Sequence, residues 1–194
     1  MSTTDVIIEH LISGIQAAIW LLLLTVLLFG DSWVSWATIK DIPTELIIAF
    51  IAIVYPIGIF IDEIADRLLN PFVEIIRTHI FNKEDIPNDK RHKVRVSYIL
   101  PYSKEDDSLR LYFNYVRTRI RIARASIINF SLITIFLILF LIVHSSNDIF
   151  QLIMVFCLGT LITLIAIFSW YSFTKTFVQR TAILWKINEK EDNN

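Results

Sequence analysis

The chain has 194 residues, of which 55% are hydrophobic and 19% are charged, and its formal net charge at pH 7 is −1. Soluble domains are typically about 45–50% apolar and about 25% charged. The apolar residues are gathered into long runs without charge, which a soluble core does not require. These features indicate a multi-pass membrane protein and exclude a secreted disulfide scaffold, a disordered chain and a soluble enzyme domain.

Four segments are apolar enough to cross a bilayer: residues 11–29, 46–61, 127–143 and 149–171. A membrane-spanning helix needs about 20 apolar residues to cross about 30 Å of hydrocarbon. A cleaved signal peptide is a poor description of the first segment, because residues 1–10 contain no Lys or Arg. We therefore predict an all-α fold, with four transmembrane helices and a small, mainly helical cytoplasmic layer.

The distribution of Lys and Arg predicts the orientation. Thirteen of the 18 lie in residues 64–126, four lie in residues 173–194, and only Lys40 lies in a connector on the other side. Basic residues favour the cytoplasmic side of a membrane. We expect both termini to face the cytoplasm of a bacterium and the spans to lie in its inner membrane.

This orientation divides the chain into four parts. Residues 1–63 form a first transmembrane hairpin, 64–126 a cytoplasmic connector, 127–172 a second hairpin, and 173–194 a cytoplasmic helix and tail.

The connector contains several predicted elements. The second helix continues beyond residue 61, and Asn70-Pro71 is expected to bend or end it, because proline disfavours helical geometry in the residue before it. A short amphipathic helix over 72–81, a polar loop over 82–93 and a strand or extended stretch over 94–100 follow. From about Leu109 a helix runs without interruption into the third span, and the fourth span likewise continues as a helix.

The cores of the spans contain no ionisable residue, which argues against a proton-coupled transporter, since charges inside membranes usually mark transport pathways. A pore lined by threonines remains an alternative, although such hydroxyls more often bond their own helix or a neighbouring one. These residues are Thr25, Thr134, Thr160 and Thr163. Pro56 and Gly58 interrupt the second span; a packing kink is favoured over a hinge that couples the cytoplasmic part to the bilayer.

The most distinctive string surrounds the entry to the third span, where Arg110, Arg117, Arg121 and Arg124 share one stripe of the predicted helix. These arginines are candidate partner- or lipid-binding residues, since juxtamembrane arginines attract anionic lipid. They are also candidates for an ion-pair network with the acidic residues at the same level, because Arg makes planar bidentate contacts. The acidic residues are Asp62, Glu63 and Asp66.

A phosphate site among the arginines is a further alternative. Direct nucleic-acid binding is not expected, because residues 64–126 hold 13 basic against 8 acidic residues and no aromatics placed for stacking.

No pattern indicates an enzyme. Cys157 is the only cysteine and lies in the fourth span, and the four histidines form no metal-binding motif. We expect no catalytic residue, no metal and no cofactor.

In length, topology and the arginine-rich connector, the chain resembles the four-span membrane subunits of bacterial anti-phage defence systems, in particular the KwaA-like subunits of Kiwa systems. The resemblance covers the architecture of the whole chain and no diagnostic motif. It implies an inner-membrane sensor that forms an oligomer and acts with a soluble, DNA-binding cytoplasmic partner.

The hypothesis from sequence is a non-enzymatic membrane scaffold or sensor that forms a homo-oligomer, contacts membrane lipids and recruits a soluble cytoplasmic protein. Charge reversal of Arg117, Arg121 and Arg124 is expected to abolish partner binding. The alternatives are an effector pore that depolarises the membrane and an assembly factor for a larger membrane complex.

Overall fold

A computed structural model describes residues 3–30, 43–96, 107–144 and 149–192. Its elements are α1 (Thr3–Phe29), α2 (Thr44–Lys83), the single 3-10 turn η2 (Asn88–Lys90), α3 (Arg91–Val96), α5 (Asp107–His144) and α6 (Ile149–Asp192). The described residues contain no strand, and four of the helices are long and apolar enough to cross a membrane. The predicted all-α fold with four transmembrane helices is confirmed.

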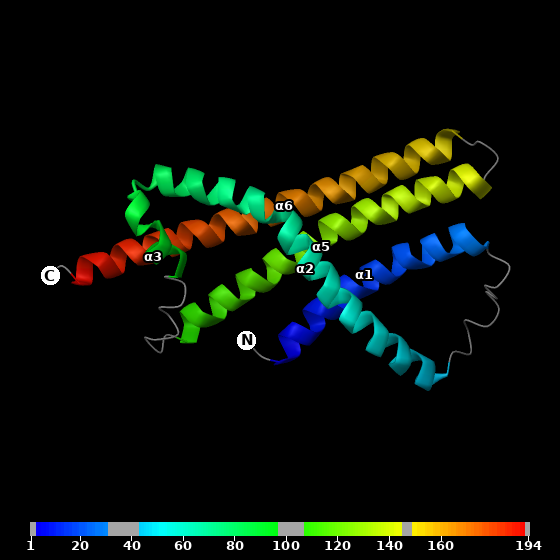
Figure 1. Cartoon of the computed structure of the whole chain (residues 1–194), viewed down its shortest axis with the longest axis horizontal. Coiled ribbons are helices and arrows are strands. Elements are labelled where there is room, and N and C mark those ends of the chain that lie inside the picture. The colour runs from blue at the N-terminus through cyan, green and yellow to red at the C-terminus, as the bar shows by residue number, and fades with distance from the viewer. Residues whose placement is uncertain (1–2, 31–42, 97–106, 145–148, 193–194) are drawn as a thin grey trace.

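Helix α5 is central to the bundle. Helices α1 and α6 each pack along it, and α2 crosses the bundle with contacts to α1, α5 and α6 (Figure 1). The described ends of the chain lie at one end of the molecule, together with α3 and the start of α5 (Figure 1). We call this end the charged end, because the Arg residues of α5 and the outer part of α6 lie there.

Two glycines bring the backbones of α1 and α2 into direct contact where the helices cross. A Cβ atom at Gly58 would lie 1.8 Å from the carbonyl oxygen of His10, and one at Gly14 would lie 2.0 Å from that of Val54. Small residues permit such close approach between membrane helices. The expected close approach at Gly58 is therefore present, beside Pro56 inside α2; the hinge role of Pro56 and Gly58 stays a prediction.

Helix α2 is continuous through Pro71 to Lys83, so the expected end of the helix and a separate helix over 72–81 were wrong. A proline removes one backbone hydrogen bond and bends a helix, but the remaining bonds hold it together. Figure 1 shows α2 changing direction partway along, after which it runs beside α6.

An apolar cluster holds the outer part of α2 against α6. Its buried members come from α2, the following turn, α3 and α6: Ile80, Phe81, Ile86, Val94, Val178 and Ala182. Val94 lies in the helix α3, so the strand or extended stretch expected from residue 94 is wrong for 94–96; residues 97–100 lie outside the described part. Packing of Val94 into this cluster favours a short helix over an extended edge.

Two ion pairs at the rim of this cluster link the same elements. Lys186 Nζ lies 2.8 Å from Glu84 Oε2, and Lys90 donates a hydrogen bond to Glu189. That hydrogen bond and the charge of Glu189 hold the pKa of Lys90 above its ordinary value. The charged end is therefore a packed layer of α2, α3 and α6.

Helices α5 and α6 each run unbroken from the apolar span into the charged end, as expected. Helix α5 contains 38 residues and α6 contains 44, well beyond the length that a bilayer requires. Both helices are therefore rigid connections between the apolar bundle and the charged layer.

Candidate functional site

A buried cluster of charged side chains joins three helices where the apolar spans end. Glu9 comes from α1, Asp62 from α2, and Arg121 and Arg124 from α5. Arg121 Nε lies 2.8 Å from Glu9 Oε1 and 3.1 Å from Asp62 Oδ2, and Arg124 Nη2 lies 3.1 Å from Asp62 Oδ1. Arg121 thus bridges α1 and α2, and Asp62 receives both guanidinium groups.

The remaining acidic residues expected here divide according to the helical period of α2. Asp66, one turn after Asp62, also accepts a hydrogen bond from Arg124. Glu63 points elsewhere and pairs with Arg67 on its own helix at 3.0 Å, where both side chains are exposed. Adjacent residues on a helix point about 100° apart, so only the four-residue spacing reaches α5.

The cluster is buried enough to matter for stability. The exposed fraction is 1% for Glu9 and 7% for Asp62, and Arg124 is also buried. Ions removed from water are costly unless each meets an opposite charge, and removing one partner from such a pair is strongly destabilising. The arrangement therefore fixes α1, α2 and α5 relative to one another.

His10 adds a third potential metal ligand beside the carboxylates. Donor atoms of Glu9, His10 and Asp62 lie within 4.8 Å of one another, His10 Nδ1 has no hydrogen-bond partner in the described part of the chain, and neither do the oxygens of Glu9. However, the Arg121 guanidinium already lies against both carboxylates. A metal ion would meet this positive charge, so ion pairing is the simpler chemistry.

Asn129 forms a polar clasp between α1 and α5 deeper in the apolar bundle. Its Nδ2 atom donates to the Ser13 carbonyl oxygen at 3.0 Å and to Gln16 Oε1 at 3.3 Å, and its Oδ1 atom accepts from Trp20 Nε1 at 3.0 Å. The side chain of Asn129 is fully buried. Polar side chains inside a bilayer link helices in this way.

A cavity of about 500 Å³ adjoins the ion-pair cluster between α2, α5 and α6. Four arginines and three carboxylates line it, together with Asn70, Thr174 and several apolar side chains. The arginines are Arg77, Arg117, Arg121 and Arg124, and the carboxylates are Asp62, Glu63 and Asp66. Sites for small molecules commonly have volumes of about 300–1,000 Å³.

The four arginines expected to act together have different surroundings. Arg121 and Arg124 belong to the buried cluster, and Arg117 lies on the cavity wall with them. Arg110 is exposed and does not line the cavity. Charge reversal at Arg121 or Arg124 would therefore disturb helix packing as well as any partner.

Sequence reasoning missed several residues of the cluster and the clasp. Glu9 and His10 were assigned to the mouth of the first span and given no role, and Gln16 and Asn129 were noted only as polar. The available signal was periodicity, since Glu9, Ser13, Gln16 and Trp20 follow one another at intervals of four, three and four residues. This spacing places them on one face of α1.

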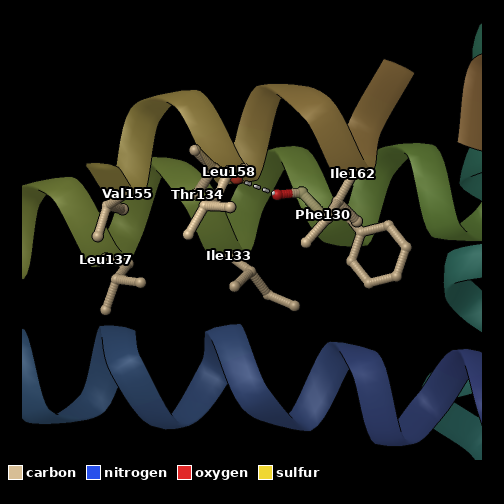
Figure 2. Close-up of a pocket in the computed structure, with 8 residues that line it drawn as sticks. Phe130, Ile133, Thr134, Leu137, Val155, Leu158 and Ile162 are labelled. Carbon is tan, nitrogen blue, oxygen red and sulfur yellow. Dashed lines mark hydrogen bonds between the residues drawn. The ribbon is translucent and has the colours of Figure 1, made fainter. Parts of the chain in front are cut away.

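The threonines considered for a pore mostly bond their own helix. Thr25, Thr134 and Thr163 each donate to the carbonyl oxygen four residues earlier. Figure 2 shows the bond from Thr134 to Phe130 beside an apolar pocket of about 170 Å³ between α5 and α6. These hydroxyls are already satisfied within the chain, which does not favour the pore.

Comparisons with protein-family models, with curated proteins and with solved structures find no match for this chain. The fold and the site therefore define the class directly: a multi-pass, all-α membrane protein with four candidate spans and a charged layer at one end.

Proposed function

We propose that this protein is a non-enzymatic scaffold or sensor of the bacterial inner membrane that recruits a soluble cytoplasmic protein through its charged end. The observation that carries the proposal is an exposed apolar stripe on α2, formed by Leu68, Phe72 and Ile75. Their exposed fractions are 59%, 54% and 65%. Residues four and three positions apart share one face of a helix, so the three side chains form a continuous surface.

The position of this stripe favours a protein partner over lipid. Ile75 follows Asp62 by 13 residues, which is about 20 Å of helix. The headgroup layer adds only about 5–8 Å beyond the hydrocarbon on each side. The end of α2 packs on Val178 and Ala182 of α6, which lie about 10 and 16 Å of helix beyond Tyr171. The stripe thus extends out of the bilayer with α6.

The proposed orientation rests on the charge asymmetry. Seventeen of 18 basic residues lie on the side of the charged end, and basic residues favour the cytoplasm. The layout shared with the membrane subunits of Kiwa systems extends the proposal to anti-phage defence, with a DNA-binding protein as the recruited partner.

Self-association is part of the same proposal. The first turns of α2, residues 44–53, are exposed on every side within the single chain. Inside a bilayer such a segment is covered either by lipid or by another span. This unpartnered segment supports a homo-oligomer, which native mass measurement of the purified protein would count.

The test is affinity purification of the full chain from its own cells in mild detergent, followed by mass spectrometry. In the variant carrying Leu68→Asp and Ile75→Asp, a buried apolar contact would meet two charges. We expect a soluble protein to accompany the wild-type chain in fixed stoichiometry and to be lost from this variant.

A matched control is Thr78→Asp, which adds a charge to an exposed position of the same helix. This variant is expected to retain the partner. Equal recovery of the soluble protein with all three chains, or no soluble protein with the wild type, would overturn the proposal.

A further inference from the structure

The cavity between α2, α5 and α6 lies beside the ion-pair cluster and has a wall chemistry that the cluster does not use up. Asp62 and Asp66 are held by Arg121 and Arg124, and Glu63 by Arg67. Two further arginines, Arg77 and Arg117, line the same cavity. The lining side chains carry four positive and three negative charges, so a ligand with negative charge fits the balance.

The charges are also separated along the cavity. The carboxylates occupy residues 62–66 of α2, at the end of the apolar span, whereas Arg77 lies 11 residues beyond Asp66. Arg117 lies seven residues beyond Arg124 in the same outward direction along α5. The basic residues therefore occupy the outer part of the cavity, away from the carboxylates that would repel an anion.

Two buried donors on lining residues have no acceptor in the described part of the chain. They are the hydroxyl of Thr174 and the Nε–H of Arg124. Buried donors are nearly always paired, and an acceptor-rich group bound beside them would complete the set. Arginine is the preferred partner of phosphate because its planar fork donates two hydrogen bonds at once.

We propose that this cavity binds a phosphate group, held by Arg77 and Arg117 with Asn70 on the same wall. The group belongs either to a phospholipid headgroup entering from the membrane or to a soluble phosphorylated small molecule. The volume of about 500 Å³ accommodates either one. This site is separate from the apolar stripe on α2, so it stands or falls independently of the recruited partner.

The experiment uses the full chain with two probes. In the first arm, native mass spectrometry records whether phosphatidylglycerol or phosphatidylethanolamine stays bound after detergent exchange. In the second arm, inorganic phosphate is titrated against the delipidated protein at constant ionic strength, and thermal unfolding is followed. Retention in the first arm identifies a lipid source, and stabilisation in the second identifies a soluble one; either result supports the site.

The test variant combines Arg77→Gln and Arg117→Gln. Each lost charge-assisted contact is expected to weaken binding by roughly tenfold. The matched control is Arg119→Gln, because Arg119 is exposed, stacks on Tyr115 at 5.0 Å and does not line the cavity. A second test variant, Val73→Phe, fills the cavity without changing charge and is expected to lose binding too. Absence of wild-type binding in both arms, or binding unchanged by Val73→Phe, would overturn the proposal.

Discussion

Gly58 of α2 lies against the carbonyl oxygen of His10 on α1, so closely that a Cβ atom there would be 1.8 Å from that oxygen. The contact is between two backbones, and no side-chain rotation can relieve an added methyl group. The crossing of α1 and α2 therefore depends on this glycine, and the crossing in turn brings Glu9 and Asp62 within reach of Arg121.

The first prediction concerns this crossing. Gly58→Ala should lower the free energy of unfolding by about 3 kcal/mol, the upper range for overpacking a tight contact. The measurement is unfolding of the purified protein in detergent micelles by titration with SDS. The control is Gly159→Ala, whose Cβ would meet the side chain of Thr134 rather than backbone. It should cost clearly less, and equal losses would show that the crossing is not special.

The second prediction concerns the buried cluster. Asp62→Asn leaves Arg121 and Arg124 without their shared carboxylate and should destabilise the protein by about 3–5 kcal/mol. Glu63→Gln is the matched control, because the Glu63–Arg67 pair is exposed and should contribute less than about 1 kcal/mol. The same SDS titration compares them. Similar effects of the two variants would contradict a structural role for the cluster.

The third prediction concerns the polar clasp. Asn129→Ala removes three interhelical hydrogen bonds and should cost about 2 kcal/mol, since such bonds average about 0.6 kcal/mol inside a bilayer. Ser131→Ala is the control, because this hydroxyl bonds the carbonyl oxygen of Ile127 on its own helix. A loss at Ser131 as large as that at Asn129, again by SDS titration, would argue against the clasp.

The fourth prediction concerns the outer layer. The side chain of Phe81 is buried between α2 and α6, and Phe81→Ala should weaken that packing by about 3–5 kcal/mol. Trypsin should then cleave faster near Lys83 and Lys90, while the apolar bundle stays intact. Phe72→Ala, at an exposed position, should leave the cleavage rate unchanged. An unaltered rate in Phe81→Ala would mean that the layer does not depend on this cluster.

The spans and the long helices could be predicted from sequence because both follow from local composition. Runs without charge predicted four spans, and the uninterrupted periodicity after Leu109 predicted α5. The path of α2 beyond Pro71 was not local: the helix continues because Ile80 and Phe81 find a surface on α6. The short α3 depends on the same packing, which no pattern within residues 91–96 reveals.

The partners in the charged cluster were only partly predictable. Asp62, Asp66 and the arginines could be placed at one level because α2 and α5 pass the membrane boundary there. The contribution of Glu9 required knowing that α1 crosses α2 at Gly58, which sets the distance between two helices far apart in helix direction. The cavity lined by Arg77 and Arg117 depends in the same way on the bend in α2 and its return to α6.

The most direct test of the proposed recruitment is photo-crosslinking in intact cells, with a photoreactive amino acid introduced at Phe72. The same amino acid at Phe50, exposed on the apolar part of α2, is the control. The proposal predicts an adduct of defined mass with a soluble protein at Phe72 and none at Phe50. Adducts only with lipid, or only with copies of this chain, would contradict recruitment through the α2 stripe.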